Sequence, residues 1–333
     1  MDHFVLLTII LALVFDFING FHDSANAIAT VVATKVLTPL KAVTMAAVFN
    51  LVGPLVFGTA IASMIGKGII DTEIITVNVI FAALVGAVIW DLITWYAALP
   101  TSSSHALVGG LVGAATAAAG ISSVHASGVE KIIFFMIVSP IIGLAFGFIF
   151  ALFIMRAFRK SLPSKINHYF RRLQLFSAAF YSLTHGTNDA QKTMGVIAIL
   201  LVAEGISLPT GNNQLPIPFW VIISCAGAIG LGTFFGGWRI VKTMAQRVTR
   251  LRPYQGFAAE TSSGIVLAFM ASLGIPVSTT HVISSSIMGV GATDKLSAVR
   301  WGIARKIVGA WILTIPAAAL ISGATFMVLK VFS

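Results

Sequence analysis

Charged side chains are scarce in this sequence. Asp, Glu, Lys and Arg make up 10% of the 333 residues, whereas a soluble domain carries roughly 25%. Hydrophobic residues account for 57%. The polar surface that a soluble protein needs is therefore missing. Because backbone groups inside a bilayer must satisfy their hydrogen bonds internally, the long apolar runs predict helices, and we expect an all-α polytopic membrane protein.

Cysteine is nearly absent as well. The single Cys225 excludes an intrachain disulfide, and its apolar surroundings predict a buried, small hydrophobic residue. A positively charged n-region is also missing from Met1-Asp2-His3, and no small-residue cleavage site follows the first apolar run. We therefore expect the first helix to be retained rather than removed as a signal peptide.

The apolar runs are long enough to cross a bilayer, which takes about 20 residues of helix. Ten segments are expected, at 4–33, 40–66, 74–98, 102–120, 131–155, 174–203, 217–238, 256–274, 279–292 and 307–330. The first segment of each half is about 30 residues long, or about 45 Å of helix, and contains Gly20 or Gly186 beside polar residues. This length predicts tilted or broken helices.

Two of the junctions between neighbouring apolar segments contain no Lys or Arg. Residues 99–105 and 275–281 each contain a Pro followed by Ser or Thr residues and a His. We expect each junction to be the tip of a re-entrant helical hairpin that ends inside the protein, where irregular backbone is tolerated. Counting the hairpins gives about 10 to 12 membrane segments.

The basic residues gather in alternate loops. Of the 21 Lys and Arg residues, 17 lie in the loops at 34–41, 156–173, 239–252 and 293–306, and three lie on the other side. The positive-inside rule then places both termini outside. The same spread argues against nucleic-acid binding, which would need one basic face. The predicted units are a first repeat at 1–155, a short basic cytoplasmic linker at 156–173 and a second, inverted repeat at 174–333, an architecture typical of secondary transporters.

The hairpin tips carry the first candidate site. Hydroxyl side chains after a Pro cap the first turn of a helix, and two such helix N-termini would offer free N–H groups to one anion. No fixed charge accompanies them, which suits a tetrahedral oxyanion that must be released. The candidate anion ligands are Thr101, Ser102, Ser103, Ser104, Ser278, Thr279 and Thr280. His105 and His281 are expected either to hydrogen-bond the tip backbone or to contact the substrate.

Acidic motifs carry the second candidate site. Asp23 and Asn26 lie three residues apart, on one face of a helix, and offer oxygen ligands to a hard monovalent cation. The second half repeats the motif unequally, with Asn188 and Asp189 followed by Lys192 where the first half has Asn26. An ammonium cannot bind a cation, but it can neutralise the neighbouring carboxylate or hold an anion. The two sites are therefore expected to be related but unequal.

Several other intramembrane polar residues are secondary candidates, because such groups are costly inside a bilayer. They are His22, His185, Gln191, Asp91 and Glu260. For Asp91 and Glu260, which precede the two tips, the roles left open are gate, proton relay or hairpin strut. Asp16, one or two turns from Asp23, is expected nearer an aqueous end.

These residues resemble the inorganic phosphate transporter (PiT) family, in its bacterial low-affinity phosphate permease branch. The matching motifs are 20–26 (Gly-Phe-His-Asp-Ser-Ala-Asn), 184–192 (Thr-His-Gly-Thr-Asn-Asp-Ala-Gln-Lys) and the two Pro-x-Ser-x-x-His tips. The resemblance implies that the tips bind phosphate and that the Asp motifs form the cation region. Sodium-coupled members carry Asp-x-x-Asn in both halves, so Lys192 favours the proton-coupled branch. Under sodium coupling the metal ligands would be Asp23, Asn26 and Asp189.

The sequence thus predicts a secondary active transporter that imports inorganic phosphate by proton symport with alternating access. The alternatives are a sulfate or metal–phosphate permease of the same fold, or a sodium-coupled phosphate symporter. A channel and a membrane-embedded hydrolase are disfavoured, the latter because the sequence shows no metal-ligand cluster around the two Asp motifs. We expect no enzymatic activity and no cofactor. The expected partners are phosphate, the coupling cation, the lipid bilayer of a bacterial plasma membrane and a second copy in a homodimer.

Overall fold

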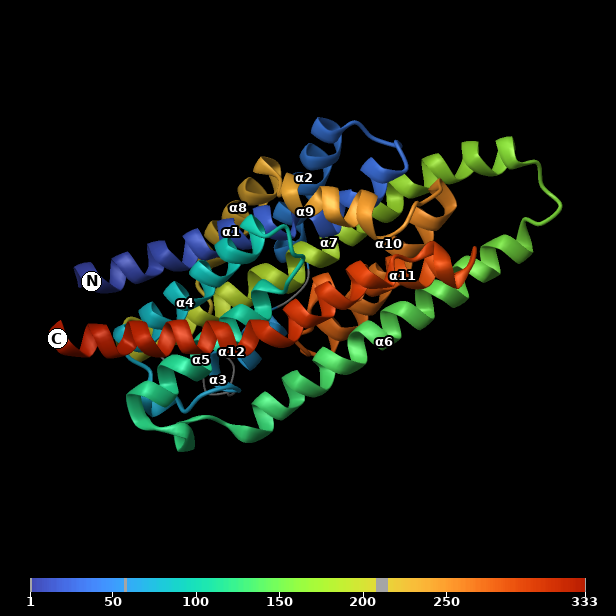
Figure 1. Cartoon of the computed structure of the whole chain (residues 1–333). Helices are drawn as coiled ribbons and strands as arrows, with labels where there is room; N and C mark the ends of the chain where they lie inside the picture. The colour runs from blue at the N-terminus through green and yellow to red at the C-terminus, as the bar shows by residue number, and fades with distance from the viewer. Residues whose placement is uncertain (1, 57–58, 208–214, 333) are drawn as a thin grey trace.

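A computed structural model describes residues 2–56, 59–207 and 215–332 of the chain. Within them the chain is helical and contains no β-strand, only one isolated bridge between Ile70 and Val124 (Figure 1). The helices are α1 (His3–Ala33), α2 (Pro39–Val56), α3 (Ala60–Lys67), α4 (Val77–Tyr96), α5 (Ser103–Ala119), α6 (Ala126–Ala157), α7 (Pro163–Ala203), α8 (Phe219–Phe235), α9 (Trp238–Lys242), α10 (Pro253–Ser272), α11 (Thr279–Ala292) and α12 (Trp301–Phe332). The all-helical expectation is confirmed.

The number of apolar spans is smaller than expected. In the described residues five helices are long and apolar enough to cross a membrane, namely α1, α2, α4, α6 and α12. The bent pair formed by α8 and Trp238–Val248 would make a sixth. The difference from ten segments has two causes. The α5 and α11 helices have only 17 and 14 residues, and α7 and α10 are polar helices that the protein itself buries.

The breaks in the helices lie one segment later than expected. Both α1 and α7 are continuous, and Gly20 and Gly186 lie inside them. These glycines instead allow close packing: a Cβ on Gly20 would lie 3.1 Å from Cα of Ile229, and one on Gly186 would lie 2.6 Å from Cα of Asn50. The expected segment 40–66 is two helices, α2 and α3, and residues 57–58 between them are outside the described part.

The second interrupted segment begins with α8. It bends by 56° before Trp238–Val248, where α9 passes into a π-helix at Thr243–Val248. The expected cytoplasmic loop at 239–252 is therefore helical through residue 248. The expected linker at 156–173 is also mostly helical, because α6 ends at Ala157 and α7 begins at Pro163.

Corresponding helices of the two halves make corresponding contacts. The α1 helix packs against α8, and α7 packs against α2. The hairpin of α4 and α5 packs against α12, while the hairpin of α10 and α11 packs against α6. Each hairpin thus rests on the last helix of the other half. Both chain ends lie at one end of the bundle, and the α6–α7 connection lies at the other (Figure 1).

The buried apolar residues form two clusters, one toward each end of α1. One contains Val5 to Phe15 on α1 and the C-terminal half of α7 from Ala190 onward. The other contains Ala25 to Val31 on α1 and Ala178 and Tyr181 on α7. The polar motifs therefore lie at the junction of two apolar cores, near the middle of both long helices.

Candidate functional site

Both hairpin tips are helix N-termini capped by a serine. The Ser102 hydroxyl accepts a hydrogen bond from the His105 N–H at 3.3 Å, and the Ser278 hydroxyl accepts one from the His281 N–H at 3.1 Å. Pro100 and Pro276 each lie two residues before the capping serine, outside the helix, and the serine satisfies an N–H group of the first turn. The capping expected from the sequence is confirmed in both copies.

The second tip reaches the acidic residues of both halves. The Thr279 hydroxyl donates to Oδ2 of Asp189 at 3.1 Å, and the Thr280 hydroxyl donates to Oδ2 of Asp23 at 3.2 Å. The Thr280 hydroxyl also accepts from the Asn26 amide at 2.9 Å. One hairpin of the second half therefore joins α1 to α7 through two neighbouring threonines.

Lys192 connects the first tip to the second. Its ammonium donates to Oδ1 of Asp189 at 2.6 Å, to the Ser104 hydroxyl at 2.5 Å and to the Val277 carbonyl at 3.1 Å. An ammonium has three donors, so all of them are used. Lys192 therefore neutralises Asp189, as the sequence suggested, and lies between the two tips.

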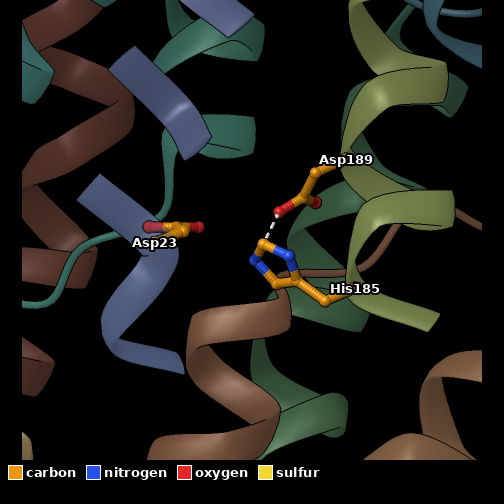
Figure 2. A group of neighbouring side chains, drawn as sticks. All are labelled: Asp23, His185 and Asp189. Carbon is orange, nitrogen blue, oxygen red and sulfur yellow. Dashed lines mark ion pairs between the residues drawn. The ribbon is translucent and has the colours of Figure 1, made fainter. Parts of the chain in front are cut away.

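A histidine accompanies each carboxylate. Nδ1 of His22 lies 2.8 Å from Asp23, and its Nε2 lies 3.1 Å from the Thr94 hydroxyl. Nε2 of His185 lies 3.2 Å from Oδ2 of Asp189. Figure 2 shows His185 between Asp189, on the same helix, and Asp23 on α1. Thr94 lies on α4, three residues after Asp91, and the sequence pairs these two polar residues in the segment before the first tip.

The three residues of Figure 2 form a candidate cation site. One ligand atom each of Asp23, His185 and Asp189 lies within 4.8 Å of the others, and all three are buried. This grouping corrects the sequence expectation that no metal-ligand cluster surrounds the two Asp motifs. The group contains two of the three expected metal ligands, Asp23 and Asp189, and adds His185. The third, Asn26, donates its amide hydrogen to Thr280, and its Oδ1 has no partner in the described residues.

The site is buried, and its acidic groups outnumber its permanent cations. Its side chains are at most 8% exposed, the largest value belonging to Ser104. Two carboxylates, Asp23 and Asp189, face a single permanent cation, Lys192. The net charge then depends on His22 and His185: with both rings neutral one negative charge remains, and a proton on either ring cancels it. In the first case the buried charge favours binding of one monovalent cation, because an unpaired charge is costly in a protein interior.

Other predicted residues lie outside this contact set. Gln191 accepts from the Ile61 backbone at 2.9 Å, and the Asn188 amide donates to the Thr184 carbonyl at 2.8 Å. Both oxygens of Asp91 lack a hydrogen-bond partner in the described residues, as does the hydroxyl of Ser103. Gln191 and Asn188 thus hold backbone groups of neighbouring helices, while the roles of Asp91 and Ser103 stay predictions.

The two tip histidines stack instead of bonding the tip backbone through their rings. Their ring centroids lie 4.8 Å apart, and the His281 ring lies 3.9 Å from that of Trp311 on α12. Within the described residues neither nitrogen of the His281 ring has a hydrogen-bond partner. The expected ring-to-backbone bond of His281 is therefore wrong, because aromatic stacking between the hairpins holds the ring.

Glu260 forms a separate polar cluster toward the other end of α1. It accepts hydrogen bonds from Thr30 at 2.5 Å, from Gln174 at 3.0 Å and from Ser177. Three donors satisfy this buried carboxylate without a cation. Of the roles left open for Glu260, the contacts favour a strut that ties α10 to α1 and α7.

Comparison with known proteins gives one family. The Phosphate transporter family model matches residues 19–165 and 155–322. A probable low-affinity inorganic phosphate transporter of Rhizobium meliloti (strain 1021) is 52% identical over 314 residues, covering 94% of this chain and 93% of the relative. One of Bacillus subtilis (strain 168), with the same description, is 45% identical over 335 residues and 99% of both chains.

A solved structure shares the fold. The sodium-dependent phosphate transporter superposes with a TM-score of 0.89 at 25% identity, and the match covers 100% of both chains. The family match spans most of the sequence, and the relatives match nearly end to end. These findings confirm the predicted resemblance and the expectation of a transporter rather than an enzyme. The chain belongs to the phosphate transporter family.

Proposed function

We propose that the chain is a secondary active transporter that imports inorganic phosphate across the bacterial plasma membrane by proton symport. The observation that carries this proposal is the meeting of both hairpin tips with Asp23, Asp189 and Lys192 in one buried site. The site thus combines anion-binding helix ends with a cation-binding carboxylate.

Phosphate fits the anion side of this site. Two helix N-termini with hydroxyls beside them provide donors to an oxyanion. The Lys192 ammonium supplies positive charge beside both tips, and an oxyanion would replace one of its present partners, such as the Ser104 hydroxyl. Sulfate would meet the same donors. Phosphate also carries protons that it can donate, and the carboxylates of Asp23 and Asp189 lie at hydrogen-bond distance from the second tip. These acceptors favour phosphate over sulfate.

A proton fits the cation side better than sodium does. In the second half Lys192 fills the position beside Asp189 that a sodium ion would need, and the histidine in the three-residue group is a nitrogen ligand, whereas sodium prefers oxygen. The uncompensated charge then belongs to Asp23, and one proton neutralises it. The sodium dependence named for the structural neighbour belongs to a chain at 25% identity.

The shared hydroxyl of Thr280 couples the two substrates. A hydroxyl has one hydrogen, and here it points to Asp23 while the oxygen accepts from Asn26. Once a proton neutralises Asp23, the Thr280 hydrogen is free to turn toward phosphate. Binding of the cation therefore prepares the anion site, and phosphate that arrives first meets a hydroxyl already engaged.

Import against the membrane potential needs an energy source, which symport supplies. Moving an anion into an inside-negative cell costs about 2.3 kcal/mol per charge per 100 mV, and co-transported protons offset this cost. The closed site must open to each side in turn, so we include alternating access between two inverted repeats, 1–155 and 174–333. The matched packing of α1 with α8 and of α7 with α2 supports such repeats. The location of both chain termini outside the cell and the assembly into a homodimer remain predictions.

The substrate is tested with the purified chain in proteoliposomes. Radiolabelled phosphate is supplied under an inward proton gradient in sodium-free buffer, alone, with excess sulfate, or with a metal chelator. We expect neither addition to slow uptake. Competition by sulfate would make the chain a general oxyanion permease, and loss of uptake with the chelator would make the substrate a metal–phosphate complex.

A further inference from the structure

One face of α1 carries a continuous line of buried polar side chains. Asp16, Asn19, Asp23, Asn26 and Thr30 follow one another at intervals of three and four residues, and each is at most 3% exposed. This spacing places all five on one side of the helix. The line extends from the candidate site in both directions, and the proposed mechanism uses only its middle.

Asp16 is the end of this line nearest the N-terminus. It lies seven residues before Asp23, about 10 Å along the helix. Its Oδ1 accepts a hydrogen bond from the Thr193 hydroxyl on α7 at 3.0 Å, whereas Oδ2 has no partner in the described residues. The titratable groups that face it are Cys225 on α8, Asp189 and Lys192 on α7, and none of these forms an ion pair with it.

This environment favours the neutral form of Asp16. A carboxylate with 0% exposure, no nitrogen or oxygen donor at Oδ2 and no paired cation bears a large desolvation penalty, and protonation removes it. The Cys225 thiol beside it is only a weak donor. The surroundings are apolar, since Phe15, Met194 and Ile229 belong to the neighbouring core cluster.

The fold does not require a carboxylate at this position. With Asp23 aligned to Asp189, the second half has Ser182 where the first has Asp16, and the Ser182 hydroxyl donates to the Ala178 carbonyl at 2.7 Å. The matching helix thus packs with a small, self-satisfied residue. A buried acid in only one half points to a role in the cycle rather than in packing.

We propose that Asp16 is a second proton-binding site, separate from Asp23, which takes up a proton when its side of the protein opens and keeps it while the site is closed. Asn19 lies one turn nearer Asp23, and its side-chain Oδ1 also has no partner in the described residues. This oxygen can accept a hydrogen bond from a proton carrier that moves along α1 between Asp16 and the water-accessible side. No covalent bond changes: one proton is bound from water and later released to water. This proposal rests on the proposed proton symport.

The test compares Asp16→Asn with wild type in two assays on the same proteoliposomes. The first is accumulation of phosphate driven by an inward proton gradient, and the second is exchange of labelled for unlabelled phosphate without a gradient. We expect Asp16→Asn to lose gradient-driven accumulation and to retain exchange, because exchange needs phosphate binding but no net proton movement. Asp294→Asn, which changes an exposed carboxylate, is the matched control and should retain both.

Thr193 provides a variant that keeps the acid. Thr193→Val removes the donor that stabilises the charged form, so proton-driven uptake should persist to higher external pH than in wild type, while Thr193→Ser should not shift it. Accumulation by Asp16→Asn equal to wild type would overturn the proposal. If wild type itself ignores the proton gradient, the proposed symport fails instead, and loss of exchange in Asp16→Asn would show that the residue serves structure.

Discussion

Replacing Lys192 by asparagine tests how the second half of the site is neutralised. The change recreates the Asp-x-x-Asn spacing of the first half. It removes the ammonium 2.6 Å from Asp189, and the carboxylate keeps only Thr279 and His185 beside it. Breaking a buried ion pair on one side costs about 3–5 kcal/mol. Lys192→Asn should therefore unfold at a lower temperature than wild type in sodium-free buffer.

Sodium should recover much of this loss. An asparagine oxygen and the freed Asp189 form an oxygen site of the kind that Asp23 and Asn26 could offer, and a ligand at 100 times its Kd adds about 2.7 kcal/mol. The assay is thermal unfolding of the purified chain in sodium chloride against choline chloride at equal ionic strength. Lys192→Met is the control, because it removes the charge without adding a ligand. Wild-type stability of Lys192→Asn without sodium, or an equal sodium effect on Lys192→Met, would refute the reasoning.

Three further changes address the tip, the strut and the helix packing. Thr280→Val should weaken binding of phosphate and of the coupling cation together, measured by uptake against each concentration, while Thr280→Ser restores both because it keeps the hydroxyl beside Asp23. Glu260→Gln should lower the free energy of unfolding by about 1–3 kcal/mol, seen as a lower unfolding temperature, because the new amide hydrogens face existing donors. Gly186→Ala should destabilise by about 1–3 kcal/mol through a backbone clash, whereas Gly227→Ala, with open space around it, should not.

The sequence predicted the site better than it predicted the helices that carry it. The tip serines cap helices in both copies, and Lys192 neutralises Asp189 as expected. These features depend on neighbours within a few residues or on two opposite charges three positions apart. Local spacing therefore carried enough information to identify them.

Of the two alternatives for the long segments, tilted or broken helices, the structure excludes the break, because glycine beside polar residues does not by itself interrupt a buried helix. In the structure Gly20 and Gly186 lie in continuous helices and face backbone of α8 and α2. A helix that other helices surround can bury Asp189 and Lys192 and remain continuous. Its mean hydropathy is then low, and the apolar stretch in the sequence is shorter than the helix itself. Such burial is a property of the assembled fold, which a single segment does not reveal.

The contacts between distant segments were the part that spacing could not supply. His185 joins Asp23 only because α1 and α7 lie side by side, and the His105 and His281 rings stack only because the hairpins meet. The expectation of ring-to-backbone bonds considered each tip alone. Each of these pairs is separated by more than 160 positions.

Uptake of radiolabelled phosphate under separately imposed gradients is the most direct measurement of the proposed coupling. Proteoliposomes receive an inward proton gradient without sodium, or an inward sodium gradient at equal pH, with Asp23→Asn measured beside wild type. We expect the proton gradient alone to drive accumulation in wild type and not in Asp23→Asn. Accumulation that requires sodium and ignores the proton gradient, or that survives in Asp23→Asn, would contradict proton symport at this site.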